Sequence, residues 1–144
     1  MRAALGSDER TPLTDAAAAD LRERGFEGVP VGAPGGEEIS WAEVGRRVGE
    51  LVAAGEVELA VLFCWTGTGV SIAANRVRGV RAALCADAVT AAGARRWNDA
   101  NVLVMSLRST SVALAGEMLE AWLTTQTDPA EAASIASLDD GPVG

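Results

Sequence analysis

Short apolar runs alternate with helical segments along the chain, and this alternation constrains the fold more than any other feature. Strands are expected at residues 2–6, 29–31, 59–64, 80–85 and 102–105. Helices are expected at residues 13–24, 41–52, 70–77, 88–97 and 109–125, with a short final helix beginning at Asp128-Pro129. Strands separated by helices form a parallel sheet with helices on both faces. We therefore expect an α/β fold built on a five-stranded parallel sheet.

The length of the chain, 144 residues, suits one domain with a sizeable core. No internal repeat and no linker divides it. We expect a single domain over residues 1–138. The end of the chain, residues 139–144, has little apolar surface to bury, and we expect a mobile tail there.

Composition argues against several classes of function. A net charge of −8 argues against nucleic acid and anionic membranes as partners. No apolar run approaches the roughly 18 residues of a membrane-spanning helix, and the N-terminus reads as a strand rather than a signal peptide. Histidine is absent, which excludes Ser/His and Cys/His couples and histidine-based metal sites. We expect no metal and no cofactor. The two cysteines end different strands and are expected to be reduced, in a cytoplasmic setting.

The segment from Cys64 to Asn75 carries the chemistry. Cys64 follows an apolar run and ends the third expected strand, where open α/β sheets place their ligands. Gly67 and Gly69 let the backbone approach a ligand, and the helix that follows offers unpaired N–H groups to negative charge. A strand, a nucleophile or base, and an anion cradle therefore meet within a few residues.

Four separated blocks, in order, resemble the type B ribose-5-phosphate isomerases and the galactose-6-phosphate isomerase subunits. The blocks are Gly6-Ser7-Asp8 and residues 64–75, 79–85 and 98–103. The resemblance covers roughly residues 1–125. It implies a Rossmann-like three-layer sandwich and a homodimer or dimer of dimers. It also implies a metal-free aldose–ketose isomerase, in which a base moves a proton between neighbouring sugar carbons through a cis-enediol(ate).

The resemblance also implies roles for individual residues. Cys64 stands where one branch of the family has its cysteine base, and Val70 stands where another branch has a glutamate. The amides of the turn at residues 67–71 can stabilise a thiolate and, with Asn98, hold the enediolate oxygen. Thr66 can hydrogen-bond the thiolate or the substrate. The full candidate set comprises the catalytic Cys64, Thr66 and Asn98 and the substrate-binding Asp8, Glu9, Trp65, Gly67, Thr68, Gly69, Ser71, Trp97 and Arg108.

Several positions depart from the family pattern. Glu9, Trp97 and Ala86 stand where the family carries histidines, and the Trp97 position is associated with opening the sugar ring. Trp65 replaces a glycine. Glu131 and Ile135 stand where the C-terminal helix brings arginines to the substrate phosphate, so only Arg108 matches a family arginine. A smaller, less basic and more aromatic pocket follows, so we expect a sugar or sugar phosphate other than standard ribose 5-phosphate. The missing ring-opening histidine favours an open-chain substrate, such as a four-carbon sugar phosphate, over a stable pyranose.

Two other hypotheses remain open. In the first, the chain is a catalytically weakened homologue that binds a small ligand. In the second, it is one subunit of a hetero-oligomeric isomerase whose other subunit bears histidines. Cys85 is expected in the core, and Trp41 and Trp122 in the core or an interface. Trp65 and Trp97 suit packing as well as a pocket wall, and Glu9 suits a solvated charge as well as a replacement acid–base. Asn75 and Asn101 are expected to be structural caps.

Overall fold

Parallel strands form the middle layer of the molecule. In a computed structural model, residues 1–141 are described. Within them, five strands lie in the order β2-β1-β3-β5-β4, and every neighbouring pair is parallel. The strands are β1 (Arg2–Ser7), β2 (Glu27–Gly32), β3 (Leu59–Cys64), β4 (Ala82–Leu84) and β5 (Val102–Ser106). The predicted α/β fold with a five-stranded parallel sheet is confirmed.

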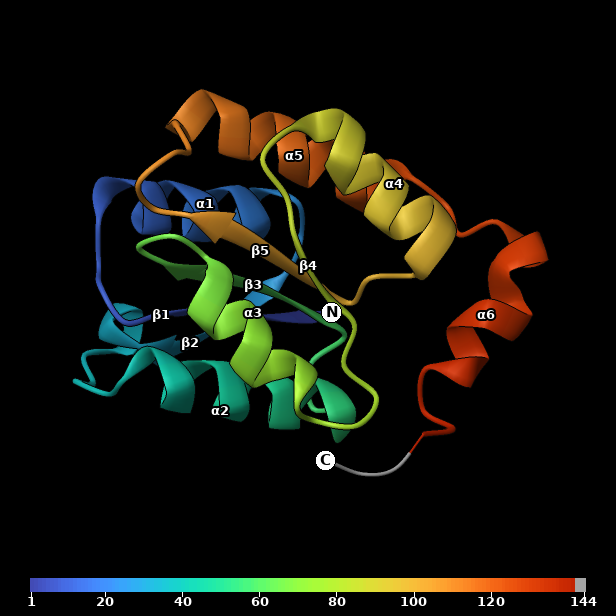
Figure 1. The fold of residues 1–144 in the computed structure, drawn as a ribbon. Coiled ribbons are helices and arrows are strands. Elements are labelled where there is room, and N and C mark those ends of the chain that lie inside the picture. Colours follow the sequence, from blue (N-terminus) through green and yellow to red (C-terminus); the bar gives the residue numbers. More distant parts are fainter. Residues whose placement is uncertain (142–144) are drawn as a thin grey trace.

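Helices cover both faces of this sheet (Figure 1). The helices are α1 (Pro12–Glu23), α2 (Trp41–Ala53), α3 (Thr68–Asn75), α4 (Ala88–Asn98), α5 (Val112–Thr124) and α6 (Ala132–Ser137). One face packs against α1, α4 and α5, and its core includes Phe63 and Trp122. The other packs against α2 and α3 around Val44 and Leu62. Cys64 belongs to the second core and Cys85 to the first, so the sheet separates the two thiols.

Two glycines bring α2 and α3 unusually close. A Cβ built on Gly45 would lie 2.6 Å from the Cβ of Ala73, and one built on Gly49 would lie 2.9 Å from Cγ2 of Val77. Either atom would push the helices apart, because such distances are shorter than van der Waals contact. This close packing fixes the position of α3 against α2.

The fourth strand and the fifth helix are shorter than expected. The chain turns at Gly79, whose φ is +89°, and pairing as a strand begins only at Ala82. The helix over 109–125 begins at Val112, because the Ser111 side chain accepts a hydrogen bond from the Leu114 N–H and caps it. No helix within residues 1–141 is long and apolar enough to span a membrane.

The C-terminal segment stands apart from the sheet. Asp128 caps a 3-10 turn (Pro129–Glu131) that leads into α6, as the Asp-Pro pair predicts. After α6 the chain returns toward the sheet, and the Asp139 Oδ1 accepts a hydrogen bond from the Gly79 N–H, before β4, at 3.2 Å. Residues 142–144 of the expected mobile tail lie outside the described residues, and the tail stays a prediction.

Candidate active site

The carboxyl ends of the central strands bring three short side chains together. Cys64 pairs in register with Ser106, and Ser7 pairs with Phe63, the residue before Cys64. The Cys64 side chain ends β3 at the surface of the second core and is only 6% exposed. This edge is where parallel α/β sheets bind ligands, and it lies at the left of Figure 1.

Gly67 forms the turn between β3 and α3. Its φ is +81°, a value that L side chains rarely adopt, and it precedes the first turn of α3. A Cβ there would lie 2.6 Å from Cδ1 of Leu84 and 3.2 Å from the Met105 carbonyl oxygen. The first N–H groups of α3, from Thr68 onward, have no carbonyl partner inside the helix. They form an anion cradle one turn from the cysteine.

The loop after β5 holds the peptide that follows Cys64. The Arg108 N–H and the Ser106 hydroxyl both donate to the Trp65 carbonyl at 2.9 Å, and the Leu107 N–H donates to the Cys64 carbonyl at 3.0 Å. The side chains of Trp65 and Arg108 remain exposed. The loop therefore fixes the backbone and leaves both side chains free to meet a ligand.

Polar side chains complete this edge. The hydroxyls of Thr66 and Thr68 lie 2.8 Å apart, and Ser71 follows one turn into α3. Asp8 comes directly after β1. Its Oδ1 is buried, and no described residue donates a hydrogen bond to it. Buried polar atoms are rarely left unpaired, so this oxygen is suited to a ligand hydroxyl. Glu9 is exposed, with its N–H bonded to the Ser7 hydroxyl.

Trp41 lies beside this cradle. A Cβ on Gly69 would lie 2.7 Å from Cε3 of Trp41, so the indole packs directly on the Gly69 backbone. Trp41 remains 47% exposed. Its position on an apolar helical face predicted a core or interface residue, and that spacing contains no signal for contact with a loop 28 positions later in the sequence.

Trp97 and Asn98 lie elsewhere. Helix α4 runs back against the strand direction, from the carboxyl end of β4 to the amino end of β5. Asn98 is its last residue, and it is exposed beside the amino edge of the sheet. The length of a five-residue strand, roughly 15 Å, separates the two edges. One chain therefore does not bring Asn98 or Trp97 to Cys64, and their proposed roles require a second copy.

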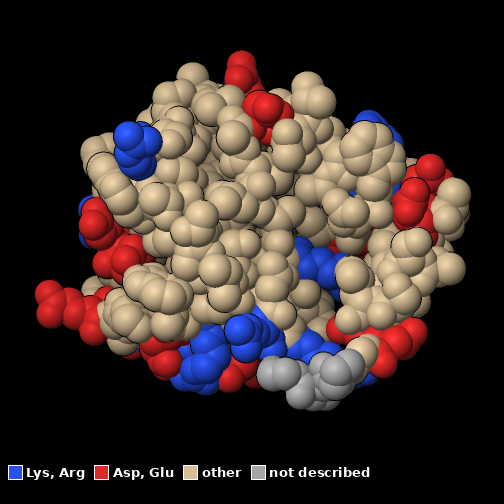
Figure 2. All heavy atoms as spheres, in the orientation of Figure 1, with Lys and Arg blue, Asp and Glu red and all other residues tan. Residues whose placement is uncertain are grey.

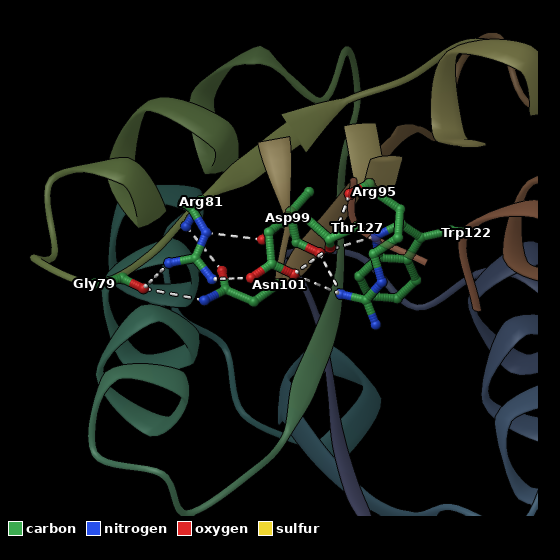
Figure 3. A network of polar contacts seen from close by, with 8 residues as sticks. Gly79, Arg81, Arg95, Asp99, Asn101, Trp122 and Thr127 are labelled. Atoms are coloured by element: carbon green, nitrogen blue, oxygen red, sulfur yellow. Dashed lines mark hydrogen bonds and ion pairs between the residues drawn. The ribbon is translucent and has the colours of Figure 1, made fainter. Parts of the chain in front are cut away.

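A polar network anchors the turn that carries Asn98 (Figure 3). Asp99 has a φ of +47°, and its carboxylate faces Arg81, Arg95 and Thr127. The Arg81 Nε donates to the Asp99 carbonyl at 2.7 Å, and Asn101 bonds both the Gly79 carbonyl and the Arg81 N–H. Asn101 is a structural cap, as predicted. The network uses up the polar groups of Asp99 and Asn101, and it leaves the Asn98 side chain free.

Few side chains in this sequence have pKa values between those of carboxylates and arginines. The sequence contains no histidine, lysine or tyrosine. Burial, and next the charge of Asp87, raise the pKa of Cys85 from 9.0 to about 11, so this thiol is inert at neutral pH. Its core position is confirmed. Among residues 1–141, no cluster of three or more His, Cys, Asp or Glu side chains could hold a metal ion.

Comparison with known proteins identifies the fold and its relatives. A family model described as Ribose/Galactose Isomerase matches residues 3–137. The chain is 39% identical to ribose-5-phosphate isomerase B of Escherichia coli over 108 residues, which are 75% of this chain and 72% of that protein. It is 38% identical to D-erythrulose-4-phosphate isomerase 2 of Mycolicibacterium smegmatis over 122 residues, 85% and 79% of the two chains.

Solved structures agree with these relatives. Ribose-5-phosphate isomerase B of Clostridium thermocellum superposes with a TM-score of 0.90 at 32% identity, over 97% of this chain and 96% of that one. The type B enzyme of Trypanosoma cruzi gives 0.89 at 35% identity, over 97% of each chain. The resemblance inferred from the four sequence blocks is confirmed.

Proposed function

This chain belongs to the ribose/galactose isomerase family, and from that premise we propose that it interconverts an aldose and a ketose of a sugar phosphate with Cys64 as the base. The observation that carries the proposal is the position of Cys64. Its thiol ends β3 beside the glycine turn and the free N–H groups of α3. A base and an anion cradle so close together suit proton abstraction next to a carbonyl.

The proposed reaction moves one proton between neighbouring carbons. The Cys64 thiolate takes the proton from the carbon beside the aldehyde, and the electron pair moves to the carbonyl oxygen to form a cis-enediolate. Amides of residues 67–70 donate to that oxygen, and Asp8 accepts a hydrogen bond from a sugar hydroxyl. A proton then passes from the neighbouring hydroxyl to the former carbonyl oxygen, and the thiol returns its proton to the former aldehyde carbon. The ketose forms and the thiolate is regenerated.

Asn98 completes this site only from a second copy of the chain. Since one chain holds Asn98 and Cys64 at opposite edges, a two-fold dimer would carry two sites, each with Cys64 from one chain and Asn98 and Trp97 from the other. Exposed apolar side chains near the cradle, Trp41 and Ile72 among them, suit such an interface. We therefore include a homodimer, or a dimer of dimers, in the proposal.

The proposed substrate is an open-chain sugar phosphate, with four carbons as the first candidate. Without histidine, the chain has no neutral-pH acid–base side chain to open a sugar ring. Among its relatives, two are named D-erythrulose-4-phosphate isomerases. The exposed Trp65 and Trp97 offer flat walls to a small sugar. A reducing location such as the cytoplasm is part of the proposal, because the two thiols lie apart on opposite faces of the sheet.

A panel of aldose–ketose pairs, phosphorylated and unphosphorylated, tests the reaction. The wild-type chain should convert at least one phosphorylated pair, and Cys64→Ala should abolish that conversion. Cys85→Ala is the matched control and should keep full activity, since Cys85 lies on the other face of the sheet. Equal turnover by Cys64→Ala and the wild type would refute the cysteine base.

One observation favours a second function. Glu131 is partly buried at the start of α6, in a position where the resemblance places a phosphate-binding arginine. A weakened homologue that binds a small ligand, or a subunit that needs a histidine-bearing partner, would carry such a change. No turnover on the whole panel, with activity only after addition of a co-purifying subunit, would favour this function over the first.

A further inference from the structure

A hollow separates the body of the molecule from the C-terminal helix. Its volume is about 660 Å³, within the usual size range of ligand pockets. Its polar and apolar walls come from the end of α3, the edge strand β4, the end of α4 and the segment after α6. The lining residues that matter below are Arg76, Arg78, Arg81, Asn98 and Asp139. Figure 2 shows basic atoms inside this hollow and along its lower margin.

Two of the three arginines in the hollow have no carboxylate partner among the described residues. Arg81 forms an ion pair with Asp99 at 3.2 Å. Arg78 donates only to the backbone carbonyl of Asp139, and Arg76 makes no ion pair or side-chain hydrogen bond within residues 1–141. In a chain with 20 acidic residues and 12 basic ones, two such guanidinium groups facing one hollow form a local site for an anion.

Asn98 ties this hollow to the reaction. It lines the same hollow as Arg76 and Arg78. In the proposed dimer, Asn98 meets the cradle beside Cys64 of a second copy. The two arginines then lie next to the same substrate, on the side from which Asn98 approaches.

We propose that Arg76 and Arg78 bind the phosphate of the substrate across the dimer interface. The inference rests on the proposed function and names its phosphate subsite. Guanidinium groups bind phosphate with paired, charge-assisted hydrogen bonds. In this chain the turn between α3 and β4 supplies the guanidinium groups. Glu131 and Ile135 stand at the C-terminal positions where the resemblance places arginines. Arg108, from the chain that provides Cys64, adds a contact to the substrate from the opposite side of the interface.

Steady-state kinetics test the subsite. Arg76→Ala with Arg78→Ala should raise KM for the phosphorylated aldose about tenfold or more, because each lost charged hydrogen bond weakens binding. The same aldose without its phosphate should react at an unchanged kcat/KM. The charge-matched control, Arg22→Ala with Arg47→Ala, removes the exposed Arg22 of α1 and the partly exposed Arg47 of α2, and should leave the kinetics of both substrates unaffected. An unchanged KM for the phosphorylated aldose in Arg76→Ala/Arg78→Ala would overturn the subsite.

Binding of inorganic phosphate by calorimetry separates the two proposals. The affinity should fall in the Arg76→Ala/Arg78→Ala variant and stay at the wild-type value in the control. If the affinity for phosphate falls in that variant but the wild type converts no sugar, the proposed reaction is refuted and the anion site is supported. If the enzyme isomerises sugar phosphates but the affinity for phosphate is unchanged in the variant, phosphate binding by Arg76 and Arg78 is refuted and the proposed reaction is not.

A mixed dimer tests whether the arginines act across the interface. Cys64→Ala chains and Arg76→Ala/Arg78→Ala chains carry different tags and are co-expressed, so that dimers with one chain of each kind can be purified. One of the two sites in that dimer then has both its cysteine and its arginines. At low substrate concentration it should give about half the wild-type activity. Activity no higher than that of the two parent variants would show that the arginines serve their own chain, and would overturn the proposal.

Discussion

Cys64 and Asn98 lie at opposite edges of the same sheet, Cys64 at the carboxyl end of β3 and Asn98 beside the amino end of β5. Both come from sequence blocks that match an isomerase family, and both are proposed to act on the same enediolate. A single chain cannot satisfy both roles. The geometry therefore makes the proposed reaction depend on a dimer.

Replacement of Asn98 should impair turnover without loss of stability. Asn98 is exposed, and its side chain makes no hydrogen bond within residues 1–141, so Asn98→Ala should melt like the wild type. Loss of a donor to a developing oxyanion should lower kcat about 100-fold or more, with little change in KM.

Asn101 provides the matched control for Asn98. Its side chain bonds the Arg81 N–H at 2.8 Å and the Gly79 carbonyl at 3.0 Å. Asn101→Ala leaves the Arg81 N–H unpaired, and leaves the Gly79 carbonyl with only the longer bond from the Arg81 guanidinium at 3.4 Å. It should lower the free energy of unfolding by about 2 kcal/mol. Urea denaturation of both variants checks the contrast. A stable Asn101→Ala and an unstable Asn98→Ala would contradict these assignments.

Comparison of Gly67→Ala with Gly36→Ala separates the cost of steric crowding at the Gly67 turn from the cost of a positive φ. Both have a φ of +81°, but nothing lies within 4 Å of a Cβ on Gly36, whereas a Cβ on Gly67 meets Leu84 and the Met105 carbonyl. Gly36→Ala should cost about 1 kcal/mol of unfolding free energy from backbone strain alone. Gly67→Ala should cost about 2–4 kcal/mol and abolish turnover, because overpacking adds to the strain. Equal losses in the two variants would contradict the close contacts at Gly67.

Cys85 should make the fold sensitive to alkali. Its pKa in the folded protein is about 11, against 9.0 in the reference state, so the unfolded chain loses this proton first. The contribution of the protonated Cys85 thiol to the free energy of unfolding is complete below pH 9 and is lost as the pH rises through 11. The loss should reach about 2–3 kcal/mol. Urea denaturation of the wild type and Cys85→Ala measures it, and a loss of the same size in Cys85→Ala would contradict the assignment.

Local patterns in the sequence predict most of the fold. The strand at residues 59–64 is predicted to the residue, because an unbroken apolar run marks a buried parallel strand. The strand at 80–85 is predicted too long, since the turn at Gly79 and the Asn101 side chain occupy its first residues. Capping by Ser111 likewise shortens the expected helix at 109–125.

The candidate site is predicted only in part, for a physical reason. Residues next to Cys64 in the sequence lie next to it in space. Trp41 joins them through the close packing of α2 on α3. Arg76 and Arg78 share a hollow with Asn98 because α3 and α4 both end at the amino edge of the sheet. Such contacts between distant segments leave no periodic trace. Residue spacing also contains no information on which groups a second copy brings to the site.

Deuterium exchange tests the central claim, that Cys64 moves the proton. The enzyme is incubated in D2O with the substrate found in the panel, and NMR follows deuterium at the carbon beside the carbonyl. The wild type should incorporate deuterium at that carbon, and Cys64→Ala should not, although it keeps the fold. Incorporation by Cys64→Ala at the wild-type rate would contradict the account.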